Sequence, residues 1–169
     1  MALKVEQIAV GDLLFDPSNV RSHSQRNLDA IKGSLTRFGQ QKPIIVDKDN
    51  VVRAGNGTLA AVRELGWETI TVVRSELLGA EMTAFAIADN RTAELAEWDY
   101  SQLGAVLGAL ADEEESCDVA TGFTVAEIQA LVPHQSSGSE EDGDGSLSDN
   151  LADVLPDATN VCPKCGFRF

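Results

Sequence analysis

The sequence predicts a small α/β domain, more narrowly α+β with a mixed sheet, followed by a disordered acidic tail. Three observations lead to this fold class. Short apolar runs of strand type alternate with helical patterns up to residue 133. One of the strands passes through glycines directly into a helix. From residue 134 the chain becomes polar, acidic and rich in glycine, a composition that buries too little apolar surface to order itself.

The first elements alternate between the two types. Apolar positions predict a strand over 5–10, and residues 16–19 are typical of a turn. Apolar residues at helical spacing predict a helix over 28–38, which Ser24 can cap and Gly39 can end.

A hairpin follows this helix. Its two strands are expected at 43–46 and 51–54, with a turn at 48–50. A helix over 58–65 comes next, and Gly66 is placed to close it.

The rest of the folded region contains one more strand and several helices. The strand is predicted at 69–73, and helices at 81–90, 101–111 and 124–131. We therefore expect a domain over 1–133, a flexible acidic linker over 134–160 and a small cysteine-containing end over 161–169.

Charge is distributed unevenly along the chain. The 27 acidic and 13 basic residues give a net charge of −14, which excludes a protein that coats nucleic acid over its whole surface. Residues 17–75, however, carry nine basic residues against five acidic ones, a net charge of +4. This stretch favours a site for an anion such as a phosphate or a short piece of nucleic acid. Ordinary surface charge is the alternative explanation.

The connection between the strand at 51–54 and the next helix carries the clearest chemical signal. It is formed by Gly55, Asn56 and Gly57. Free backbone N–H groups and the helix dipole favour an anion at such a helix start, and Thr58 can add a hydroxyl and Arg53 a charge. The loop lacks the Gly-Lys-Ser/Thr ending of a Walker loop. The alternative is a tight connection that binds nothing.

Four short motifs occur in a defined order: Asn-x-Arg-x-His at 19–23, Gln-x-Pro at 41–43, Arg-Ala-Gly-Asn-Gly-Thr at 53–58 and Asp-Asn-Arg at 89–91. This series resembles the ParB N-terminal domain of the ParB/sulfiredoxin superfamily over roughly residues 4–132. It looks most like the phage and mobile-element type and the methyltransferase-associated type.

The resemblance implies a nucleotide site, with an NTP (ATP or CTP) and Mg²⁺ as ligands. Superfamily members include CTP-binding clamps on DNA, ATP-dependent sulfinic-acid reductases, free-serine kinases and nucleases. The residues that match the nucleotide- and phosphate-binding motifs are Arg21, His23, Gln41, Pro43, Arg53, Gly55, Asn56, Gly57, Thr58, Asp89, Asn90 and Arg91.

The glycine loop also departs from two of these relatives. Partition ParB proteins have Gly-Glu-x-Arg where this chain has Gly55-Asn56-Gly57-Thr58, and sulfiredoxin has a catalytic cysteine near Asn56. A basic helix-turn-helix domain does not follow residue 100. We therefore expect neither reductase activity nor sequence-specific clamping of the partition type, and CTP hydrolysis is not implied.

Two residues are candidates for catalysis. Asp89 is a hard oxygen ligand that can hold Mg²⁺ beside a phosphate. His23 can act as a general base. The alternatives are a helix-surface role for Asp89 and a capping or surface role for His23.

The chain ends in a separable cysteine motif. Cys162 and Cys165 form half of a zinc knuckle, and a structural zinc needs four ligands. Two copies of the chain can share one zinc across a homodimer, or a partner can supply the second pair. The alternatives are a motif without metal and a redox pair.

These observations leave three hypotheses on function. The first is a nucleotide- and DNA-associated ParB-like module of a phage or mobile element, acting in partition, modification or regulation of DNA, with a DNA-modifying protein as partner. The second is a Mg²⁺-dependent enzyme of the same superfamily, a nuclease or an ATP-dependent phosphotransferase. The third is a nucleotide-free interaction scaffold. Because the sequence shows no secretory signal or bilayer-spanning stretch, we expect a cytoplasmic protein that does not associate with a membrane.

Overall fold

The computed structural model describes residues 4–113 and 121–132, which divide into two compact units. The first unit contains residues 4–97 and 121–122, and the second contains 98–113 and 123–132. The predicted linker and the Cys162–Cys165 motif lie outside the described residues. In the part of the chain that is described, no helix is long and apolar enough to span a bilayer.

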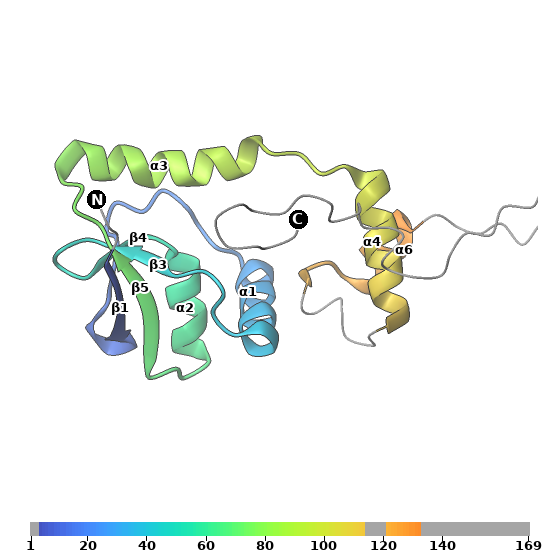
Figure 1. Ribbon diagram of the computed structural model, residues 1–169, viewed down its shortest axis with the longest axis horizontal. Helices are drawn as coiled ribbons and strands as arrows, with labels where there is room; N and C mark the ends of the chain where they lie inside the picture. Colours follow the sequence, from blue (N-terminus) through green and yellow to red (C-terminus); the bar gives the residue numbers. More distant parts are fainter. Residues whose placement is uncertain (1–3, 114–120, 133–169) are drawn as a thin grey trace, which may run out of the picture. The chain divides into compact units, whose positions relative to one another are not determined.

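The first unit is built on a mixed sheet of five strands (Figure 1). The strands are β1 (Lys4–Ala9), β2 (Leu14–Phe15), β3 (Ile44–Val46), β4 (Val51–Ala54) and β5 (Thr69–Arg74), in the order β1-β5-β3-β4-β2. The pairs β1–β5 and β3–β4 are antiparallel, whereas β3–β5 and β2–β4 are parallel. The α/β class with a mixed sheet is thus confirmed.

The strand predicted at 5–10 corresponds to β1, which ends one residue earlier than predicted. It stops at Ala9, because a 3-10 turn, η1 (Val10–Asp12), turns the chain and buries Val10. The short strand β2 was not predicted from the sequence, since two residues leave no alternation to detect.

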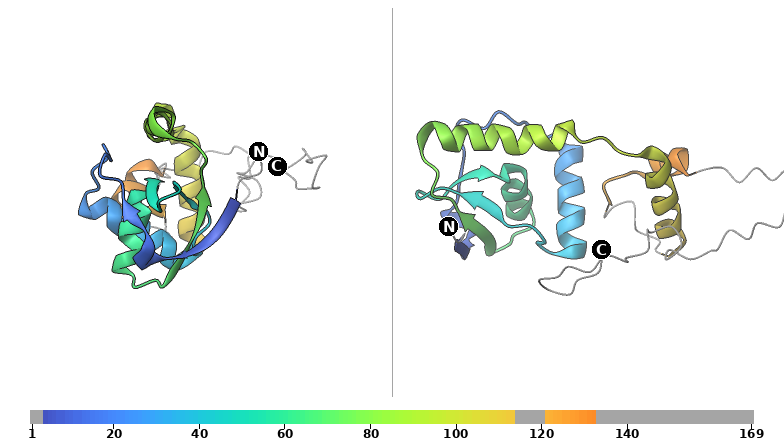
Figure 2. Two further views of the ribbon diagram at one scale, coloured as in Figure 1. Left: turned by 90° about the vertical axis from the view of Figure 1, so that its left-hand side faces the viewer. Right: turned by 45° about the horizontal axis from the view of Figure 1, so that its top comes forward.

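Three helices complete this unit: α1 (Gln25–Phe38), α2 (Asn56–Glu64) and α3 (Gly79–Leu95). The helices α1 and α2 pack on one another, and α3 runs beside β4 and the loop that leads to α1 (Figures 1 and 2). Both predicted ends of α1 are confirmed. The Ser24 hydroxyl accepts a hydrogen bond from the Asn27 N–H (3.2 Å), and Gly39, at φ +68°, donates to the Leu35 carbonyl.

The core of this unit is aliphatic, as the low aromatic content of the sequence requires. Side chains from the sheet meet the inner faces of the two packed helices. Its largest fully buried side chains are Leu13, Val46, Val52, Leu59, Val62, Ile70 and Val72.

The described residues of the second unit form a pair of helices, α4 (Tyr100–Glu113) and α6 (Val125–Leu131). Thr124 and Glu127 form a capping box at the start of α6. The two helices bury Leu107 and Ile128 between them. Gly104 lies so close to the carbonyl of Leu131 that no larger residue fits there.

Candidate functional site

The glycine loop joins β4 to α2 through a backbone shape that only glycine adopts easily. Gly55 has φ +103°, and a Cβ at this position would overlap the Ile44 side chain. The Gly55 carbonyl accepts the first bond within the helix, from the Leu59 N–H (2.9 Å). The N–H groups of Asn56, Gly57 and Thr58 precede that bond, so they are the donors that this helix start offers to an anion.

Asn56 holds the loop in place from the inside. Its side chain is buried, its amide nitrogen donates to the Val52 carbonyl (2.9 Å), and its amide oxygen accepts from the Asp16 N–H (3.1 Å). These bonds link the loop to β4 and to the segment after β2. Asn56 therefore has a positioning role, because its side chain holds the loop in the shape that was predicted to bind phosphate.

His23 lies against the first turn of α2. A Cβ on Gly57 would fall 2.7–3.0 Å from three atoms of the His23 ring, so the ring covers the space that a side chain would need. The ring is also held by Asn27, whose Oδ1 lies 2.7 Å from Nδ1. The structure therefore brings the first and third predicted motifs together at the start of α2.

A cavity of about 420 Å³ opens between α1 and the segment that leads into β3, and it reaches the first turn of α2. Gln41 and Thr58, from two separate predicted motifs, both line it. Pro43 is half-buried just before β3 and is not part of the lining. The lining residues are Ala30, Ile31, Ser34, Leu35, Phe38, Gly39, Gln40, Gln41, Lys42, Thr58, Thr121 and Gly122.

Gln40 and Lys42 are among the lining residues that were not predicted as site residues from the sequence. The Gln40 amide exchanges two hydrogen bonds of 2.8 Å with the backbone of Thr71 in β5, and it also donates to the Lys42 carbonyl (3.2 Å). The signals for them were their places beside Gln41, whose own amide donates to the Phe38 carbonyl, and, for Lys42, its charge within the basic stretch 17–75.

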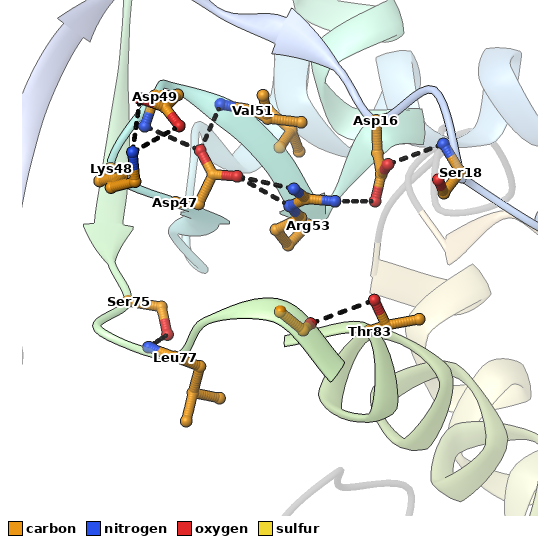
Figure 3. Close-up of polar contacts among 12 residues, drawn as sticks. Asp16, Ser18, Asp47, Lys48, Asp49, Val51, Arg53, Ser75, Leu77 and Thr83 are labelled. Atoms are coloured by element: carbon orange, nitrogen blue, oxygen red, sulfur yellow. Dashed lines mark hydrogen bonds and ion pairs between the residues drawn. The ribbon is translucent and has the colours of Figure 1, made fainter. Parts of the chain in front are cut away.

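Arg53 is held between two carboxylates (Figure 3). Its Nη1 lies 3.0 Å from Oδ2 of Asp16, and its Nη2 lies 2.8 Å from Oδ2 of Asp47. Burial by itself raises the pKa of Asp47, but hydrogen bonds from the Val51 N–H, from Arg53 and from the Asp49 N–H outweigh it and lower that pKa. The Arg53 charge is thus neutralised within the fold.

The motif at 89–91 lies on α3, beside the loop before α1. Glu94 pairs with Arg21 from that loop and with Arg91 from its own helix. Asn90 lines a small cavity of about 40 Å³ together with Asp16 and Arg53, while its amide donates to the Ala86 carbonyl (2.7 Å).

Among the comparisons with known proteins, the comparison with solved structures supports the architecture. No protein-family model and no curated protein matches the chain. A crystal structure of the C-terminally truncated chromosome-partitioning protein ParB from Caulobacter crescentus, complexed with CTP-γ-S, matches with a TM-score of 0.66, at 16% identity over 76% of each chain. The chain has a ParB-like fold. The same Caulobacter protein complexed to the centromeric parS site matches with a TM-score of 0.46, at 15% identity over 75% of this chain and 69% of that chain. A Pnob8-like ParB-N domain matches with a TM-score of 0.46, at 19% identity over 66% of this chain and 46% of that chain.

Within the ParB-like fold, the predicted catalytic residues stay predictions. Asp89 is half-buried on α3, and its carboxylate makes no hydrogen bond or ion pair within residues 4–113 and 121–132. Over those same residues no three His, Cys, Asp or Glu side chains gather as a metal site. The described residues thus build no metal site of their own. A Mg²⁺ ion that arrives with a nucleotide takes most of its ligands from phosphates and water.

Proposed function

We propose that this ParB-like chain binds a nucleoside triphosphate, CTP or ATP. The phosphates would lie at the first turn of α2, and the nucleoside in the cavity of about 420 Å³. One observation carries the proposal: this cavity extends from Gln41 to Thr58 and so joins two motifs that the sequence separates. Its volume lies within the usual range for small-molecule sites.

The walls of the cavity suit the two ends of a nucleotide. Ile31, Leu35 and Phe38 of α1 give an apolar wall for a base. At the other end, Thr58 stands among the free N–H groups of the first turn of α2, where the helix dipole favours a negative group. The CTP-γ-S complex of the Caulobacter ParB supports the choice of ligand class.

We extend this proposal to a role in a DNA transaction of a phage or mobile element, with a DNA-modifying protein as partner and Mg²⁺ as the counter-ion of the nucleotide. The net charge of +4 over residues 17–75 supports a nucleic-acid contact in this otherwise acidic chain. Adding duplex DNA to the nucleotide titration tests the role, because linked binding changes both affinities by the same factor.

The first test is the exchange of Thr58 for Glu. A carboxylate in the first turn stabilises a helix, so α2 should keep its fold, while the new charge repels phosphates. We expect the wild-type protein to bind at least one of ATP, CTP and GTP saturably in calorimetric titration with Mg²⁺. Thr58→Glu should weaken that binding by at least about tenfold.

Thr58→Gln is the matched control, because it adds similar bulk without charge. Its affinity should lie much closer to that of the wild type. If the wild type binds none of the three nucleotides, with or without duplex DNA, the proposal is wrong and the interaction scaffold becomes the leading hypothesis. Release of phosphate or cleavage of DNA in the same samples would place the chain among the enzymes.

A further inference from the structure

Among the residues that the structure describes, one cation is left without a partner. Eleven of the thirteen Lys and Arg residues fall within the described residues, and ten of these interact with a carboxylate, a carbonyl or another group of the protein. Lys42 is the exception within residues 4–113 and 121–132. The ten others are Lys4, Arg21, Arg26, Lys32, Arg37, Lys48, Arg53, Arg63, Arg74 and Arg91.

In the described part of the chain, Lys42 is also the only charged residue that lines the large cavity. Its side chain is exposed at the segment before β3, and its backbone is fixed by the bond from the Gln40 amide to its carbonyl (3.2 Å). Gln40 is in turn held by both backbone groups of Thr71. The side chain that carries the ammonium group thus extends from a backbone that Gln40 anchors to β5.

Tight binding of a triphosphate requires a positive charge in addition to neutral hydrogen-bond donors. The glycine loop carries no cation, since Gly55, Asn56, Gly57 and Thr58 are all uncharged. The nearest cation in the sequence, Arg53, is already neutralised by Asp16 and Asp47. Because a charge-assisted hydrogen bond is about twice as strong as a neutral one, a free ammonium at this cavity adds what the loop lacks.

We propose that Lys42 is the cation that binds the phosphates of the ligand in this cavity, an inference that rests on the proposed function. Lys42 thereby makes the site selective for a nucleotide over the corresponding nucleoside. The contact is electrostatic, so it weakens as salt is added.

The test compares Lys42→Gln with Lys48→Gln, its matched control. Both variants remove one positive charge from an exposed lysine of the same unit, but Lys48 pairs with its neighbour Asp49 and does not line the cavity. The probes are the triphosphate that the wild type binds best and the nucleoside of the same base. We expect Lys42→Gln to bind the triphosphate about tenfold more weakly. The affinity of this variant for the nucleoside should be unchanged. Its affinity for the triphosphate should depend less on the salt concentration than that of the wild type.

Lys48→Gln should bind both probes within about twofold of the wild type, and Lys42→Arg should retain most of the triphosphate affinity because it keeps the charge. The inference is wrong if Lys42→Gln and Lys48→Gln bind the triphosphate equally well, or if the nucleoside loses as much affinity as the triphosphate. A wild-type protein that binds no nucleotide overturns the proposed function, and the role of Lys42 falls with it. Thermal unfolding of each variant checks the fold.

Discussion

At the scale of single residues, Gln40 shows how a side chain can extend a sheet. Its amide oxygen accepts from the Thr71 N–H and its amide nitrogen donates to the Thr71 carbonyl, so the side chain takes the place of a paired residue of β3. This arrangement holds the floor of the cavity to β5. A sequence pattern cannot reveal it, because the two residues lie 31 positions apart and glutamine is also common on surfaces.

We predict that Gln40→Ala destabilises the protein by about 1–3 kcal/mol, because it leaves both half-buried backbone groups of Thr71 without their partner. Urea unfolding measures the change. Gln41→Ala is the control, since Gln41 is exposed and its amide reaches only the Phe38 carbonyl. Equal losses for the two variants would contradict the special role of Gln40.

At the scale of elements, the glycine loop depends on two constraints at one residue. Gly55 needs a positive φ, and it also needs the absence of a Cβ beside Ile44. Gly66, which closes α2, shares the first constraint at φ +71° but has open space around it. In the sequence, both glycines are simply turn signals. Only the structure shows that position 55 requires glycine more strictly than position 66 does.

We predict that Gly55→Ala costs about 3 kcal/mol or more, since overlap with the Ile44 side chain adds to the backbone strain. Gly66→Ala should cost about 1 kcal/mol from the backbone alone. Thermal or urea unfolding of the two variants compares them directly. A larger loss for Gly66→Ala would show that backbone strain, rather than the contact with Ile44, dominates.

Elements were predicted best where a turn or cap residue marks their ends. The strands of the hairpin, the caps of α1 and the closure of α2 by Gly66 all follow from turn chemistry and periodicity. The prediction for α3 started two residues late and ended five residues early, at 90 rather than Leu95. Its surface explains the error, since Met82 is its only fully buried residue and the usual apolar stripe is missing.

At the scale of the whole molecule, stability depends on carboxylates that are charged in the fold. Hydrogen bonds from Arg74 lower the pKa of Glu6, and the Lys32 contact lowers that of Asp29. At Asp47, hydrogen bonds outweigh burial and again lower the pKa. A lowered pKa means that the folded state holds the charged form more strongly than the unfolded state does.

We therefore predict that stability is full above the ordinary pKa values of these carboxyl groups, 4.5 for Glu and 3.8 for Asp, and falls as the pH drops through the lower pKa values of the folded state. Melting temperatures between pH 7 and pH 2.5 measure this loss. Asp47→Asn should be less stable than the wild type at pH 7, by about 2 kcal/mol, and should lose less on acidification. Asp49→Asn, on the exposed turn, is the control. A wild-type stability that does not change down to pH 3 would contradict the prediction.

The candidate site was only partly visible in the sequence. Local motifs indicated His23, Gln41 and Thr58, and the structure places these residues at the first turn of α2 or in the cavity beside it. The partners of Arg53 could not be predicted, because Asp16 and Asp47 are two of many acidic residues in a chain with 27. Ion pairs depend on the fold, whereas turns and helix starts depend on neighbours in the sequence.

The contact between His23 and Gly57 has a consequence for how the chain can evolve. Because the imidazole ring occupies the space of a Cβ at residue 57, alanine there requires the His23 ring to shift or to be replaced by a smaller side chain. Loss of the histidine therefore removes the obstacle to a substitution of Gly57, whereas a substitution of Gly57 first requires the ring to move. Descendants of this chain should lose the histidine before they lose the glycine.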